Sequence, residues 1–307
     1  DSYGTDDGTR AYPVGLSAAM DRFRGQFGTQ SILQTLRQEG SNDATTAEAT
    51  ALNRELALNL NRDISIRTED DSPDYSLRAN VGNKIALSDS LDFGLSIAGS
   101  YGSKWRQTQL ISRTFRDPQA EFEDETESTR SVDLNASVNM GLLFTDDHEV
   151  STTSLYIRNT DDETAQVKKF NENRRLPDGL GYRDDLIKFE EREMIVNQIK
   201  GTHYLGSETR EIFPWIDLAI FPENLQYDWY YSEARAFTDI PNQTKVQSVT
   251  TNDPVTGEEL SSNVSFTGAD FRFTDLDDEV INWGGAVTLP LEFSNAVAEL
   301  QGGYAHT

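Results

Sequence analysis

The feature that most constrains this chain is a two-residue alternation of apolar and polar side chains in three segments, 75–87, 91–101 and 131–144. The last segment is the most regular. Its apolar positions are Val132, Leu134, Ala136, Val138, Met140, Leu142 and Phe144. Because successive side chains of a β-strand point to opposite faces, this period predicts strands with one apolar and one wet face.

Five weaker segments bring the number of predicted strands to eight. They occupy residues 150–158, 193–205, 225–235, 280–291 and 296–305. The first two strands are separated only by Ser88, Asp89 and Ser90, which predicts a hairpin. The sequence therefore predicts an all-β fold built from antiparallel neighbours.

The connections between these strands alternate in length. Short ones occupy 88–90, 145–148 and 292–295, 206–224 is intermediate, and long polar ones occupy 106–130, 159–191 and 236–279. Outer-membrane barrels have short turns on one rim and long loops on the other, whereas a soluble sandwich has no such rule. The pattern favours a transmembrane antiparallel β-barrel, or part of one, with long extracellular loops.

This interpretation assigns sides to particular residues. Even-numbered residues between Ser76 and Gly102 are expected to face the lumen, and the connection 106–130 is expected outside the cell. Its run Asp117–Glu127 is crowded with carboxylates, so we expect it to be disordered and cut by external protease. A solvated acidic loop explains this run better than a Ca²⁺ site, because the spacing and glycine of an EF-hand loop are missing.

Aromatic residues near the predicted strand ends would suit an interfacial girdle, although aromatic residues also favour strands in general. The candidates are Tyr75, Tyr101, Phe144, Tyr227, Tyr231, Phe293 and Tyr304.

Composition removes several classes of function. The 27 basic and 52 acidic residues give a net charge of −25, which is unsuited to binding a nucleic-acid backbone. The absence of cysteine excludes disulfides and thiolate chemistry, and three histidines far apart in sequence predict no metal cluster. No cofactor is predicted.

Residues 1–70 lack the strand period. Residues 43–59 are predicted to be helical, with Asn42 or Asp43 as N-cap. The chain is therefore divided into 1–70, a separate small unit or the end of a plug followed by a linker, and 71–307, the barrel portion.

Three segments resemble proteobacterial TonB-dependent outer-membrane receptors. They are the connector 51–63, the paired segments 75–83 and 91–101, and 225–235, which resembles a family strand whose loop begins at an arginine. The resemblance implies a 22-stranded barrel with an N-terminal plug, located in the outer membrane. It also implies import of metal chelates, glycans or peptides with energy delivered through TonB.

The chain departs from the family pattern in three respects. It has no recognisable TonB box near Asp1, its plug portion is short, and it ends at Ala305-His306-Thr307 without a terminal aromatic residue. We therefore expect a fragment that holds the end of a plug and about the first third of a barrel.

Aromatic and arginine residues where strands enter the long connections are candidates for a solute-capturing vestibule. They are Trp105, Arg106, Arg113, Arg116, Tyr230, Arg235 and Phe237. Each of these residues could equally be a girdle anchor or a surface charge.

Catalysis is not expected, because no nucleophile elbow or metalloprotease motif is present, and His203 with Ser207 and Glu208 makes only a weak hydrolytic set. The functional alternatives to a receptor are a small self-contained barrel acting as adhesin or anchor, and a secreted β-rich glycan-binding or hydrolytic domain.

Overall fold

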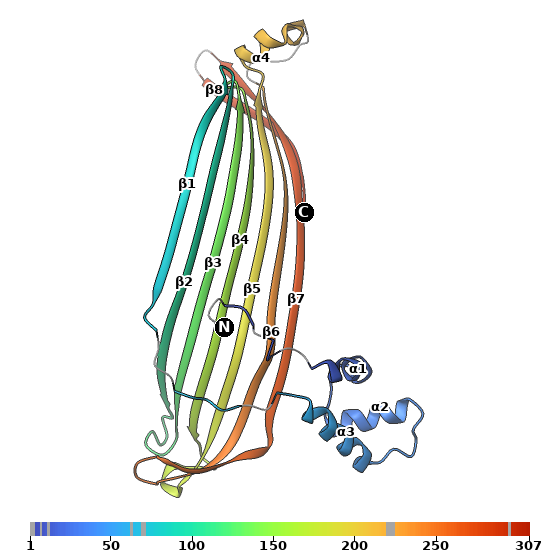
Figure 1. Ribbon diagram of the computed structural model, residues 1–307, viewed down its shortest axis with the longest axis vertical. Helices are drawn as coiled ribbons and strands as arrows, with labels where there is room; N and C mark the ends of the chain where they lie inside the picture. Colours follow the sequence, from blue (N-terminus) through green and yellow to red (C-terminus); the bar gives the residue numbers. More distant parts are fainter. Residues whose placement is uncertain are drawn as a thin grey trace.

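The computed structural model describes residues 4–6, 8–10, 13–61, 64–68, 72–218, 225–293 and 296–307. The described chain forms one long, curved, eight-stranded antiparallel sheet in which each strand pairs with the next in sequence (Figure 1). The strands are β1 (Tyr75–Ser88), β2 (Leu91–Arg113), β3 (Phe122–Phe144), β4 (His148–Phe170), β5 (Leu180–Tyr204), β6 (Gln226–Asn252), β7 (Glu259–Phe293) and β8 (Ala296–His306). The predicted all-β antiparallel fold is confirmed, with each predicted strand inside or beside an observed one.

The sheet is open. Among the described residues β1 pairs only with β2, and β8 only with β7. Both edge strands are therefore left with one unpaired side.

The short connections have local causes. Ser88 and Leu91 pair directly, and the backbone N–H of Ser90 donates to Ser88 Oγ at 3.4 Å. Thr145, with φ of 55°, makes the left-handed turn between β3 and β4, and its hydroxyl accepts from the N–H of Asp147 at 3.2 Å. Between β5 and β6 lie α4 (Ser207–Ile212) and the 3₁₀ turn η2 (Pro214–Leu218). These connections share the end of the sheet that carries α4 in Figure 1, called here the short-turn end.

The prediction of long loops was wrong. Strands continue through most of 106–130, 159–191 and 236–279, so the connections are only 114–121, 171–179, which contains η1 (Leu176–Asp178), and 253–258. In these extensions both faces are polar, and cross-strand pairs such as Ser131 Oγ donating to Asp161 Oδ1 at 2.6 Å replace apolar contacts. Local hydrophobicity therefore shows no period of two where the backbone ladder persists.

The N-terminal part folds into three helices, α1 (Val14–Phe23), α2 (Thr29–Gln38) and α3 (Thr46–Leu58). Their shared core consists of Leu16, Ala19, Phe23, Ile32, Leu33, Ala44, Ala49 and Leu56. The predicted helix is confirmed, but its N-cap is Thr45 and not Asn42 or Asp43. Thr45 Oγ1 accepts from the Glu48 N–H at 3.2 Å, and the Glu48 carboxylate accepts from the Thr45 N–H at 2.8 Å. This reciprocal capping box satisfies two backbone donors, which fixes the start of α3.

The chain direction places this helical unit. β1 begins at the end of the sheet opposite the short turns, where the connections 114–121, 171–179 and 253–258 also lie, and the helices lie beside this part of the sheet in Figure 1. Residues further upstream touch the sheet itself. The Gly4 carbonyl accepts from Thr160 Oγ1 at 2.6 Å, and Arg10 pairs with Asp162 at 3.3 Å while its guanidinium lies 4.8 Å from the Phe189 ring centroid.

Whether 1–70 ends a plug stays a prediction. Residues 1–3, 7, 11, 12, 62, 63, 69 and 70 within that range lie outside the described residues.

Candidate functional site

Strand register sorts the side chains onto two faces, because residues paired directly across neighbouring strands point to the same side. Leu95 pairs with Met140, and Ser96 with Asn139. The face that holds Leu95 is called here the apolar face, and the face that holds Ser96 the polar face. As predicted, the even-numbered residues of 76–86 and 92–102 share one face, although whether this face lines a lumen is not thereby decided.

Large apolar side chains on the apolar face are uncovered. Leu77 is 70% exposed, Val81 69% and Leu300 63%. The set, called here the apolar band, consists of Leu77, Val81, Ile85, Leu95, Ile97, Met140, Leu142, Ile195, Ile199, Tyr231, Ile281, Trp283, Val287 and Leu300. A continuous exposed apolar surface of this kind marks contact with another apolar phase or molecule.

The apolar band does not run straight across the sheet. The row of directly paired residues that begins at Tyr75 reaches Val132 on β3 but Glu191, Asp239 and Asp275 on β5 to β7. On β7 the last apolar residue before these acids is Ile281, and its row leads back to Val81 on β1. The margin of the band thus moves six residues, from Tyr75 to Val81, across six strand steps.

That displacement defines an angle. One residue per strand, at ~3.3 Å along each strand and ~4.8 Å between strands, tilts the strands roughly 35° from the normal of the band. Strands of membrane barrels are tilted by about 35–45°.

Aromatic rings lie at both margins of the band. Tyr75 and Tyr101 stack at 5.9 Å near the far margin, while Phe144 stacks on His148 at 6.0 Å and His203 on Tyr227 at 6.3 Å at the short-turn end. Trp229 Nε1 donates to His203 Nε2 at 2.9 Å. These positions agree with the expected girdle, except that the side chain of Phe293 lies outside the description.

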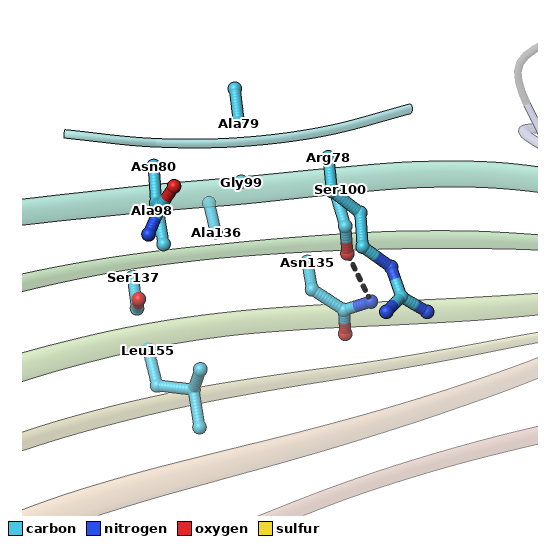
Figure 2. Close-up of a pocket in the computed structure, with 10 residues that line it drawn as sticks. All are labelled: Arg78, Ala79, Asn80, Ala98, Gly99, Ser100, Asn135, Ala136, Ser137 and Leu155. Atoms are coloured by element: carbon cyan, nitrogen blue, oxygen red, sulfur yellow. Dashed lines mark hydrogen bonds between the residues drawn. The ribbon is translucent and has the colours of Figure 1, made fainter. Parts of the chain in front are cut away.

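The polar face carries a shallow hollow of about 400 Å³ where β1 to β4 lie side by side (Figure 2). Side chains of Arg78, Asn80, Ala98, Ser100, Asn135, Ser137 and Leu155 line it. Asn135 Nδ2 donates to Ser100 Oγ at 3.1 Å, which orients the amide and leaves its Oδ1 as an acceptor. The lining thus combines amide, hydroxyl and guanidinium groups with a small apolar floor, a set suited to a hydrated small solute.

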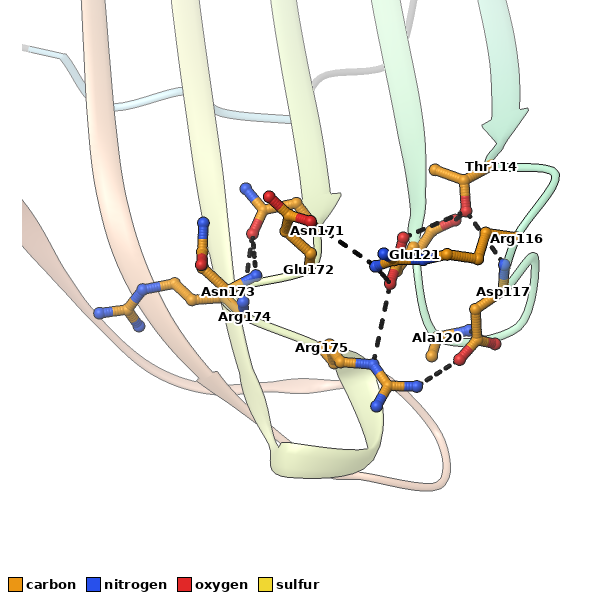
Figure 3. Close-up of polar contacts among 10 residues, drawn as sticks. All are labelled: Thr114, Arg116, Asp117, Ala120, Glu121, Asn171, Glu172, Asn173, Arg174 and Arg175. Atoms are coloured by element: carbon orange, nitrogen blue, oxygen red, sulfur yellow. Dashed lines mark hydrogen bonds and ion pairs between the residues drawn. The ribbon is translucent and has the colours of Figure 1, made fainter.

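The rim opposite the short turns is held by ion pairs (Figure 3). Arg116 Nη2 donates to Glu121 Oε1 at 2.7 Å, and Arg175 lies between Glu121 and Asp117, with its Nη2 donating to Asp117. The N–H of Leu176 also donates to the Ala120 carbonyl at 3.2 Å. Two successive connections are therefore joined to each other.

The expected disorder of Asp117–Glu127 was wrong for this reason. Glu121 is only 5% exposed, and 122–127 belongs to β3, where Lys169 pairs with Glu123. Basic residues from the neighbouring connection and strand offset the repulsion that the sequence implied.

The seven residues predicted for a vestibule do not converge. Arg106 and Tyr230 lie on the polar face of β2 and β6, outside the hollow. Trp105, Arg113, Arg235 and Phe237 lie on the other face, and Arg116 lies in the connection 114–121. Several already have internal partners. Arg235 pairs with Glu233 and Glu279, and Arg113 lies 5.2 Å from the Phe122 ring centroid.

Sequence reasoning missed the hollow. Its polar members are ordinary wet-face residues of three strands, and only the register brings Arg78, Ser100 and Asn135 into one row. The one available signal was the short turn at 88–90, which aligns β1 with β2.

The weak hydrolytic set is not assembled as imagined, since His203 Nε2 accepts from Trp229 and it is Thr209, not Ser207, whose hydroxyl contacts a histidine, His148, at 3.0 Å. Within the described ranges, no three His, Cys, Asp or Glu side chains are grouped so that they could hold a metal ion.

No family model matches this chain, and no curated protein matches it significantly. In the part of the chain that the structure describes, no helix is both long and apolar enough to cross a membrane.

Proposed function

We propose that this chain is part of an outer-membrane β-barrel of the TonB-dependent receptor class, which imports a small polar solute. In this proposal the apolar band faces lipid and the polar face lines the passage. The displacement of the band by one residue per strand carries the proposal, because a bilayer crossed by tilted strands produces this pattern.

Two competing surfaces fit the band less well. A soluble sandwich would cover its apolar face with a second sheet, yet Leu77 and Val81 are about two-thirds exposed. A protein partner could cover them, but it would have no reason to follow a straight slanted margin over seven strands. The uncovered face and its slope together favour lipid.

Solute passage is supported by the opposite face. Its hollow offers hydrogen-bonding groups from Arg78, Ser100 and Asn135 above a small apolar floor of Ala98 and Leu155. Loading by TonB and the nutrient class rest on the family resemblance alone.

Chain direction refines the topology. If the short turns face the periplasm, β1 starts on the extracellular side, and the helical unit α1–α3 attaches there too. A plug would enter a barrel from the periplasmic side, so the helices are not in the position of one. We place them outside the cell, beside the connections 171–179 and 253–258.

Spin labelling tests the membrane assignment, and the absence of native cysteine makes single-cysteine variants specific. With labels at Leu95→Cys and Ser96→Cys in reconstituted protein, the first should be accessible to oxygen in lipid and the second to an aqueous nickel chelate. Equal environments at both positions would refute the proposal.

A second pair tests the slope. Leu77 and Phe237 lie on one row of the apolar face, so a band parallel to the rows would bury both labels equally. We expect the Leu77→Cys label in lipid and the Phe237→Cys label at or above the interface. Equal depth would contradict the tilt.

The native coding sequence separates the functional alternatives. A receptor requires further strands after Thr307, a self-contained adhesin or anchor requires a stop codon close by, and a secreted domain requires solubility without detergent.

A further inference from the structure

We infer that the hollow on the polar face binds the anionic group of a small hydroxylated solute, and that Arg78 is the residue that recognises it. This inference rests on the proposed function, since it names the class of solute for that passage. It is argued from charge and from hydrogen-bond donors.

The hollow is free of carboxylates in a very acidic chain. The protein has 52 acidic residues against 27 basic ones, yet none of the residues lining the hollow is Asp or Glu. The next row of the polar face holds Asp133, but its carboxylate already accepts from Asn159 Nδ2 at 2.5 Å and lies 3.8 Å from Lys104 Nζ. An anion in the hollow would therefore meet no unpaired carboxylate on the lining.

Arg78 is available for a ligand. Most arginines on the sheet have carboxylate or aromatic partners, but no hydrogen bond or ion pair joins Arg78 to any described residue. A guanidinium presents two parallel N–H donors that match a carboxylate or phosphate, and this geometry makes Arg a stronger anion receptor than a single point charge.

Neighbouring donors point the same way. Ser100 pairs directly with Arg78 on β1 and with Asn135 on β3, so the three side chains form one row. The oxygen of Ser100 accepts from Asn135, which leaves the hydroxyl hydrogen of Ser100 free to donate. In Figure 2 the Arg78 guanidinium lies beside the Asn135 amide on the same side of the sheet.

The rest of the hollow indicates what carries the anion. Asn80 and Ser137 add neutral hydrogen-bonding groups, and Leu155 with Ala98 adds a small apolar surface. A hydroxylated carbon skeleton with one carboxylate uses all of these groups.

The test is a comparison of matched probes by calorimetry on the purified chain in detergent. Each anion is paired with a neutral isostere: glucuronate with glucose, gluconate with sorbitol, and succinate with succinamide. We expect at least one anion to bind at least tenfold more tightly than its neutral partner, and Arg78→Gln to abolish this preference.

The matched control is Arg106→Gln, which removes an equal charge from the same face outside the hollow and should leave the preference intact. Three results would overturn the inference: no anion preference in any pair, a preference that survives in Arg78→Gln, or an equal loss in Arg106→Gln. The spin labels at Leu95 and Ser96 need no ligand, so failure here and failure of the membrane assignment are distinguishable.

Discussion

At the residue scale, single carboxylates show how so acidic a chain remains ordered. Glu121 is nearly buried between Arg116 and Arg175, and its hydrogen bond raises the pKa of the Arg116 guanidinium. Asp253 caps its own connection by accepting from the N–H groups of Val255 and Thr256, both at 2.8 Å. Acidic residues therefore order these connections because each has a specific donor.

Replacement of Glu121 by Gln should loosen the rim. The change leaves two guanidinium groups without their shared carboxylate, at a local cost of about 1–3 kcal/mol. We expect backbone amides of 114–121 to exchange hydrogen roughly tenfold to a hundredfold faster by mass spectrometry. The control is Glu172→Gln, because Glu172 is 67% exposed and lies 3.7 Å from Arg116. Equal acceleration in both variants would show that Glu121 has no special role.

Asp239 should oppose folding at neutral pH. Burial, together with Asp275 and Asp6, raises the pKa of its carboxyl, and burial raises that of the facing Glu191. A raised pKa in the folded state means that ionisation weakens folding, so stability declines as pH rises above the ordinary range of aspartate. We expect Asp239→Asn to increase the free energy of unfolding at pH 7, with the gain disappearing near pH 3.

Asp253 supplies the control of opposite sign. Hydrogen bonds from Thr256 and Val255 lower the pKa of its carboxyl, so its contribution to stability is present at neutral pH and lost on acidification. Asp253→Asn should therefore destabilise at pH 7. Urea titrations at both pH values measure the two variants, and a change of the same sign in both would contradict this assignment.

At the scale of elements, close contacts between strands depend on small residues. Gly201 on β5 pairs directly with Trp229 on β6, and a Cβ at this position would overlap the indole that donates to His203. The glycine thus makes room for one margin of the apolar band.

Gly201→Ala should displace Trp229 and break its hydrogen bond to His203. Overpacking of this kind costs about 1–3 kcal/mol, and the loss is measured by urea unfolding with Trp fluorescence as the local readout. Gly141→Ala on β3 is the matched control, since a Cβ there meets nothing within 4 Å. An unchanged Trp229 signal in Gly201→Ala would show that the indole can move freely.

At the scale of the whole molecule, the two ends of the sheet should lie on opposite sides of a membrane. We expect single cysteines at Asn42 and Val255 to react with an impermeant maleimide on intact cells that carry the native protein. Cysteines at Asp89 and Asp146 should react only after permeabilisation. Asn42 lies between α2 and α3, Val255 in the β6–β7 connection, and the other two in short turns.

Each other outcome has a definite meaning. The reverse pattern would invert the topology, and reaction of all four on intact cells would exclude a membrane between the two ends. Reaction at Val255 but not at Asn42 would return the helical unit to a shielded, plug-like position.

The sequence by itself determined the strands and their two faces. Alternation in segments such as 131–144 depends only on the period of the backbone, and Thr45 with Glu48 began α3 through contacts three residues apart. Both are local relations, which a linear sequence contains in full.

Only the tertiary structure decided how far the strands extend, how they align and what their alignment brings together. The extensions of β2 to β7 are held by backbone pairing and polar cross-strand contacts, which leave no hydrophobic period to read. The slope of the apolar band and the row of Arg78, Ser100 and Asn135 depend on register between strands. Register is a relation between distant residues, so no local pattern could specify it.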